Sequence, residues 1–135
     1  MHDPAPAGQP RLRVLLVDGD ERVRESLAGL LSIGGKVLVV GAAGDASSAL
    51  DLAVEVEPDI VVVDPRLPEP ERGVAFIDRL RELAPGVRVL VMNWSDAADE
   101  CVAECAPDAF VRKTFRPSEL LAAIQAACAP APPAH

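Results

Sequence analysis

Two aspartates and a lysine stand at or just past the ends of short apolar segments of the chain. Asp18 follows Leu12–Val17, Asp64 follows Ile60–Val63, and Lys113 comes shortly after Ala109–Val111. Carboxylates hold Mg²⁺, and a metal ion together with an ammonium group neutralises charge on a transferring phosphoryl group. An aspartate can also be the nucleophile, which produces an aspartyl phosphate. These residue types suit phosphoryl chemistry, provided that the fold brings them together.

The hydrophobic pattern alternates between two periods along the chain. Short apolar runs typical of buried strands are Leu12–Val17, Val37–Val40, Ile60–Val63, Val87–Met92 and Ala109–Val111. Helical spacing of apolar residues is found at Val23–Leu31, Ala46–Val54, Phe76–Ala84, Ala98–Cys105 and Pro117–Cys128. Asp20 is the expected N-cap of the first helix, and Gly34 with Gly35 is expected to end it.

Five strand–helix units with continuous apolar strands predict an α/β fold with a parallel sheet between two helical layers. Right-handed crossovers leave few topologies, and at this length the doubly wound strand order 2-1-3-4-5 is the common one. In that order four polar residues from different strand ends converge on one edge of the sheet: Asp18, Asp64, Asn93 and Lys113. A lone aspartate after a strand is usually a turn residue. The convergence favours a functional site at Asp64.

Three segments resemble the receiver domain of two-component response regulators, and the likeness extends from about Arg11 to Cys128. They are RVLLVDGDERVRESLAGLL, PDIVVVDPRLP and AFVRKTFRPSELLAAI. The resemblance implies a flavodoxin-like (βα)5 fold and signalling in a phosphorelay. It also implies that Asp64 accepts a phosphoryl group from a histidine kinase or phosphotransfer protein. Further implied roles are Mg²⁺ binding by Asp18, Asp64 and the backbone carbonyl of Arg66, phosphoryl contact by Lys113, and switching by Asn93 and Phe110.

The chain departs from the family pattern at the same edge of the sheet. The family usually has two adjacent acids after the first strand, whereas here Gly19 follows Asp18. Asp20 is one position later, as a pocket acid or as the helix cap. The family's Thr or Ser switch position holds Asn93, and its usual Pro after the lysine is Thr114. These departures predict weak or lost Mg²⁺ binding, and they leave open a phosphorylation-independent pseudo-receiver that acts by protein contact.

An enzymatic alternative rests on the D-x-D arrangement of Asp18 and Asp20, which haloacid-dehalogenase-like phosphatases share. Glu21 and Arg22 follow where that family has Thr or Val, and a later acidic pair is missing beyond Lys113. We therefore expect no enzymatic activity beyond self-phosphorylation and self-dephosphorylation. The expected readout is an output protein or domain that binds the face of the fourth helix, fifth strand and fifth helix, with a homodimer as a further alternative.

Bulk properties limit the remaining classes of function. The chain has 135 residues and a net charge of −8, which argues against direct binding of nucleic acid. Cys101 and Cys105 are one helical turn apart, but nearby partners that would complete a zinc site are lacking. No apolar run approaches a membrane span and no signal peptide is evident, so we expect a cytoplasmic protein. The expected organisation is a disordered tail over 1–10, a receiver-like domain over 11–128 and a Pro/Ala-rich tail over 129–135.

Overall fold

The computed structural model describes residues 11–64, 73–93, 107–112 and 116–129. The strands are β1 Leu12–Val17, β2 Val37–Ala43, β3 Ile60–Val63, β4 Arg88–Asn93 and β5 Ala109–Arg112. The helices are α1 Glu21–Ser32, α2 Ala46–Val56, α3 Gly73–Leu83 and α5 Pro117–Cys128. The five strands are parallel in the order β2-β1-β3-β4-β5, which confirms the predicted fold. The helix predicted over Ala98–Cys105 and both predicted tails (apart from Ala129) lie outside the described residues.

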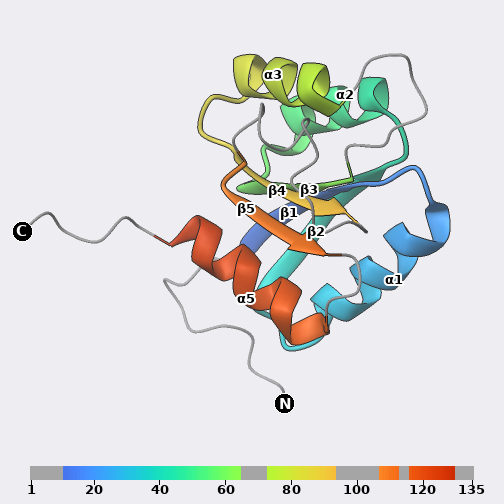
Figure 1. Ribbon diagram of the computed structural model, residues 1–135, viewed down its shortest axis with the longest axis vertical. Helices are drawn as coiled ribbons and strands as arrows, with labels where there is room; N and C mark the ends of the chain where they lie inside the picture. The colour runs from blue at the N-terminus through green and yellow to red at the C-terminus, as the bar shows by residue number, and fades with distance from the viewer. Residues whose placement is uncertain (1–10, 65–72, 94–106, 113–115, 130–135) are drawn as a thin grey trace, which may run out of the picture.

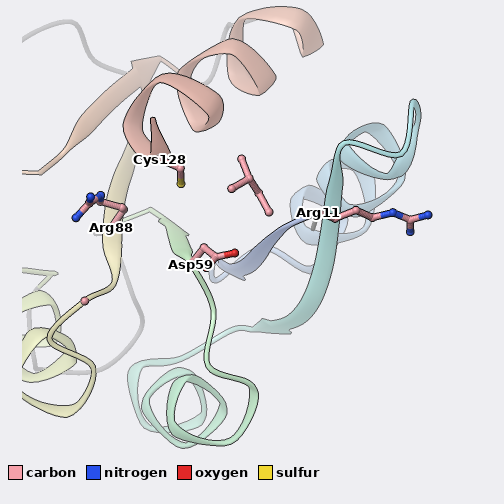
Figure 2. A pocket seen from close by; sticks show the side chains of 6 residues that line it. Arg11, Asp59, Arg88 and Cys128 are labelled. Atoms are coloured by element: carbon pink, nitrogen blue, oxygen red, sulfur yellow. The ribbon is translucent and has the colours of Figure 1, made fainter. Parts of the chain in front are cut away.

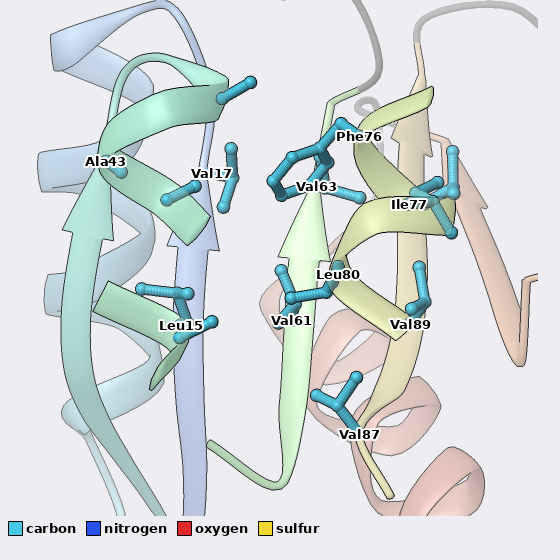
Figure 3. Packing of buried hydrophobic residues seen from close by; sticks show 14 residues of the cluster. Leu15, Val17, Ala43, Val61, Val63, Phe76, Ile77, Leu80, Val87 and Val89 are labelled. Atoms are coloured by element: carbon cyan, nitrogen blue, oxygen red, sulfur yellow. The ribbon is translucent and has the colours of Figure 1, made fainter. Parts of the chain in front are cut away.

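The sheet is covered on both faces, with α2 and α3 on one side and α1 and α5 on the other (Figure 1). Alternate residues of the central strands enter two separate cores. Leu15, Val17, Val61 and Val63 pack with Phe76, Ile77 and Leu80 toward α2 and α3 (Figure 3). Val14, Leu16 and Val62 pack with Leu27 and Leu31 of α1 and with Leu120 and Ile124 of α5. Burial on both faces explains why the central strand β3 is apolar throughout rather than alternating.

The ends of α1 and α2 follow from local hydrogen bonding. The Asp20 carboxylate accepts the N–H of Arg22, and the Asp45 carboxylate accepts the N–H of Ser48, so each aspartate caps a helix. After the C-cap at Ile33, Gly34 and Gly35 take positive φ values of 91° and 70°, which glycine tolerates best. The predictions of Asp20 as N-cap and of the two glycines as the stop signal are confirmed.

The second strand is longer than the predicted Val37–Val40. It continues through Gly41 to Ala43, and an irregularity in its pairing with β1 places Gly41 opposite Leu15. A Cβ atom on Gly41 would lie 3.2 Å from Cδ1 of Leu15, so only glycine leaves the leucine its full space. Gly and Ala are weak strand formers. Pairing with β1, which local propensity does not report, extends the strand.

Two aspartates join neighbouring strands at the amino-terminal edge of the sheet. The N–H of Asp59 donates to the Arg13 carbonyl, and its carboxylate accepts the Arg13 N–H at 2.8 Å. Asp108 makes the same arrangement between β5 and β4. Its N–H donates to the Val89 carbonyl, and its carboxylate accepts the Val89 N–H at 2.7 Å. Each aspartate follows a proline and precedes a strand, so both Pro-Asp pairs set the start of strand pairing.

Asp108→Ala is expected to lower the free energy of unfolding by about 1–3 kcal/mol, because it leaves the buried N–H of Val89 without its acceptor. Asp108→Asn keeps an acceptor oxygen and is expected to lose less. Asp59→Ala should lose less than Asp108→Ala, since the Arg13 bond is exposed to solvent. Urea denaturation of the three variants measures this order, and equal stability of all three with the wild type would contradict the assignment.

Candidate functional site

Two buried carboxylates lie side by side at the carboxyl-terminal edge of the sheet. Asp18 is 2% exposed and Asp64 is 3% exposed, and they are the only buried charged or polar residues in the described part of the chain. Val17 and Val63 are register partners in β1 and β3, so the aspartates that follow them are also neighbours. The N–H of Asp64 donates to the Val17 carbonyl at 2.9 Å, which holds Asp64 against the end of β1.

The turn after Asp18 is held by a chain of carboxylate hydrogen bonds. Asp18 Oδ1 accepts the N–H of Asp20 at 2.8 Å, and Asp20 Oδ1 accepts the N–H of Arg22 at 2.9 Å. Asp20 is exposed and serves as the helix cap. Gly19 lies between the two aspartates and is also exposed. The site therefore gathers two acids, and the second acid position of the receiver pattern offers no side-chain ligand.

An arginine that the sequence analysis missed also contacts this turn. Arg24 is half-buried in α1, and its Nη1 donates to the Asp18 carbonyl at 2.6 Å. The guanidinium lies against Gly44, where an added Cβ would fall 2.7 Å from Nη1. The only sequence signal was an arginine four residues after the cap Asp20, which does not by itself reveal a contact with another element.

The other predicted site residues are only partly placed. The backbone of Asn93 ends β4 and is the register partner of Arg112 in β5, so the two strand ends adjoin. The side chain of Asn93, the backbone of Arg66 and all of Lys113 lie outside the described residues. Phe110 is half-buried and packs against the core under α2 and α3, as suits an apolar residue at that position. The structure thus brings Asp18 and Asp64 together, and leaves Lys113 as a prediction.

The acidic residues of the site fit a magnesium ion, although they supply fewer carboxylates than the family pattern has. Mg²⁺ prefers oxygen ligands and is commonly bound through one or two carboxylates, with waters and phosphate oxygens completing its shell. Asp18 and Asp64 supply two such carboxylates from neighbouring strand ends. Within the described ranges, no group of three or more His, Cys, Asp or Glu residues could hold a metal ion. The donor set fits a metal that shares its coordination with a phosphoryl group.

A separate cavity of about 250 Å³ opens at the opposite, amino-terminal edge of the sheet. It is lined by Arg11, Leu12, Asp59, Gly86, Arg88 and Cys128 (Figure 2). Burial raises the pKa of the Cys128 thiol, and the negative charges of Asp59 and Asp108 add to this effect. The positive charge of Arg88 lowers the pKa in part. The side chains of Arg11 and Arg88 point away from one another, so they do not form a joint anion site (Figure 2). This cavity is not part of the carboxylate site.

None of the described helices has the length and apolar character needed to cross a membrane. The comparisons with known proteins agree with the fold. Residues 14–125 match the family model of the response regulator receiver domain. The chain is 37% identical over 117 residues to the response regulator MprA of Mycolicibacterium vanbaalenii, covering 85% of this chain and 49% of that protein. It is 27% identical over 125 residues to the nitrate/nitrite response regulator NarL of Escherichia coli K12, covering 91% of this chain and 57% of that protein.

The solved structures give the same result. A two-component response regulator of the LuxR family from Aurantimonas superposes with a TM-score of 0.78 at 32% identity, over 87% of this chain and 84% of that one. The signal receiver domain of a NarL regulator from Mycobacterium tuberculosis gives 0.76 at 28% identity, over 84% and 93%. The chain spans about half the length of the curated relatives it matches. With the parallel sheet and the paired carboxylates, these matches show that the chain belongs to the response regulator receiver domain family.

Proposed function

We propose that residues 11–128 form a cytoplasmic receiver domain in which Asp64 accepts a phosphoryl group from a histidine kinase or a phosphotransfer protein. One observation carries the proposal. Asp64 is a buried carboxylate at the carboxyl end of the central strand β3, beside the buried Asp18 that follows β1. In doubly wound sheets, ligands bind outside the carboxyl ends of the strands, near the point where the strand order reverses. Asp64 lies at that point between β1 and β3.

The proposed reaction is a displacement at phosphorus. A carboxylate oxygen of Asp64 attacks the phosphorus atom of a phosphohistidine, and the bond from phosphorus to the imidazole nitrogen breaks. The nitrogen keeps the electron pair, and Asp64 becomes an acyl phosphate. Bound Mg²⁺ would supply charge neutralisation to the phosphoryl oxygens. Asp18 and Asp64 would hold the metal with the Arg66 carbonyl, and Lys113 would contact the phosphoryl group.

Weak metal binding is part of the proposal. The exposed position of Gly19 and the capping role of Asp20 leave Asp18 and Asp64 as the acids of the pocket. With two carboxylates, the metal loses a charged ligand and its affinity falls. The same observation favours a second candidate function, a pseudo-receiver that binds its partner without phosphorylation. The phosphatase alternative is less favoured, because Asp20 is exposed and its carboxylate caps α1.

The output is proposed to be read at the face of β5 and α5 together with the segment between β4 and β5. Phosphorylation biases a two-state element rather than building a new one. Asn93, whose backbone ends β4, and Phe110 on the adjoining strand β5 are proposed to report a change at the site. The partner would be an output protein or domain, or a second copy of the chain. We propose no enzymatic reaction on an external substrate.

Beryllofluoride distinguishes the two candidate functions. One structure similar to this fold, the receiver domain of RcsB from Salmonella enterica, is of a phosphomimetic beryllofluoride state. We expect Mg²⁺ and beryllofluoride together to change the fluorescence of Trp94, the only tryptophan, and Asp64→Asn to abolish the change. Asp51→Asn on the exposed side of α2 is the matched control. A flat response of the wild type to both reagents would favour the pseudo-receiver.

A further inference from the structure

We propose that Arg24 is a resident cation of the acidic pocket, a positioning residue that opposes metal binding and favours the anionic phosphodonor. The inference rests on the proposed function and adds a residue to it. In the receiver pattern, a divalent metal ion balances the negative charge of the acidic cluster. Here the metal site has fewer acidic ligands than that pattern. A guanidinium hydrogen-bonded to the main chain of Asp18 would supply part of the missing positive charge.

The contact geometry is the first support. Arg24 Nη1 donates at 2.6 Å to the carbonyl of Asp18, the residue that carries one of the two buried carboxylates. The guanidinium therefore lies at the carboxyl-terminal edge of the sheet, against the main chain of Asp18. Arg24 contacts this turn through its side-chain guanidinium. Because Arg24 is half-buried, its charge is screened less than that of an exposed arginine.

The second support is the space that the chain leaves for the guanidinium. Gly44 joins β2 to α2, and its missing side chain is where the guanidinium packs. A Cβ on Gly44 would fall 2.7 Å from Nη1, 3.3 Å from Cζ and 3.6 Å from Nη2 of Arg24. Residues from α1 and from the β2–α2 loop thus combine to seat one charge. The cap at Asp20 starts α1 so that Arg24 reaches back over the turn.

The charge predicts effects of opposite sign on a cation and on an anion. Removing Arg24 takes a positive charge from the pocket, so Mg²⁺ should bind more tightly, by about threefold to tenfold for a half-buried neighbour. The same change should slow the reaction with acetyl phosphate at saturating Mg²⁺, because the anionic donor loses an attraction. A purely structural role for Arg24 would weaken both, since a loosened turn would hold neither ligand well.

The experiment compares four variants of the full chain. Arg24→Met removes the charge, Arg24→Lys keeps it, and Gly44→Ala displaces the guanidinium without changing the net charge. Arg11→Met makes the same charge change at the opposite edge of the sheet, where Arg11 is exposed. Mg²⁺ affinity is measured from the increase of Tm with metal concentration, which needs no phosphorylation. The rate of acetyl phosphate reaction is measured on the same proteins by intact mass.

We expect tighter Mg²⁺ binding and slower acetyl phosphate reaction in Arg24→Met, smaller changes of the same signs in Gly44→Ala, and near-wild-type behaviour in Arg24→Lys and Arg11→Met. Metal binding that appears only in Arg24→Met would also support the role. Weaker or unchanged Mg²⁺ binding in Arg24→Met would overturn the proposed role of Arg24. The role would also be overturned if none of the variants bound Mg²⁺. Tighter Mg²⁺ binding without any reaction at Asp64 would sustain the role of Arg24 and instead defeat the proposed phosphoacceptor function.

Discussion

Gly19→Asp is expected to tighten Mg²⁺ binding by about tenfold to a hundredfold, because it adds a carboxylate next to Asp18 in a pocket that has two. The backbone allows the change. Gly19 is exposed, and Gly34 and Gly35 are the only described glycines with positive φ, so an aspartate at 19 meets no backbone strain. Asp20 can keep its capping bond to Arg22 while the new acid turns toward the pocket. Titration of Tm or of heat with Mg²⁺ measures the affinity.

The matched control for this change is Gly86→Asp. Gly86 is exposed, a Cβ there meets nothing within 4 Å, and it lines the cavity at the opposite edge of the sheet. It adds the same charge without adding a ligand, and should leave Mg²⁺ affinity within about twofold of the wild type at ordinary ionic strength. If the Mg²⁺ affinity of Gly19→Asp were no higher than that of Gly86→Asp, the turn after Asp18 would not face the metal. The explanation of weak metal binding by a missing acid at position 19 would then be wrong.

Phe76→Ala is expected to lower the free energy of unfolding by about 3–5 kcal/mol, the usual loss when a buried phenylalanine leaves a cavity. Phe76 is fully buried and is the largest side chain in the core between the sheet and α3 (Figure 3). A domain of this size has only about 5–15 kcal/mol of stability, so the variant would be close to unfolding. Chemical denaturation at fixed temperature gives the difference directly.

Leu83→Ala on the same helix is the control, because Leu83 is 44% exposed. We expect it to cost less than about 1 kcal/mol, since most of its surface stays in water in the folded state. The comparison also bears on function. Phe76 anchors α3, the first described element after Asp64, so a loosened α3 would change the surroundings of the site. Similar losses for the two variants would show that α3 is not held by this contact.

The sheet order was predictable because each strand contains a continuous apolar run. Ile60–Val63 was predicted with the bounds it has in the structure, since four buried β-branched residues between turn residues allow little else. The first strand and the last helix were equally well marked, by a continuous apolar run and by Pro117 at the helix start. The extension of β2 to Ala43 was not predictable, because it depends on pairing with Leu15 rather than on the residues themselves.

The site was predictable to the extent that it follows strand ends. Asp18 and Asp64 meet because β1 and β3 are neighbours in register, and that neighbourhood follows from the strand order. Arg24 was missed because its contact depends on how α1 lies over the turn and on the space at Gly44. The paired bonds of Asp108 with Val89 were missed for the same reason, since an aspartate after a proline is usually read as a turn residue. Contacts between elements need the tertiary structure.

The central claim is that Asp64 accepts a phosphoryl group although the metal pocket beside it has fewer acidic ligands than the family pattern. Intact-mass measurement after incubation with acetyl phosphate and Mg²⁺ tests it most directly, with Asp64→Asn as the matched variant and hydroxylamine to cleave an acyl phosphate. We predict one phosphoryl adduct per wild-type chain, lost on hydroxylamine treatment and never formed by Asp64→Asn. No adduct at high acetyl phosphate and Mg²⁺, or an equal adduct on Asp64→Asn, would contradict the account.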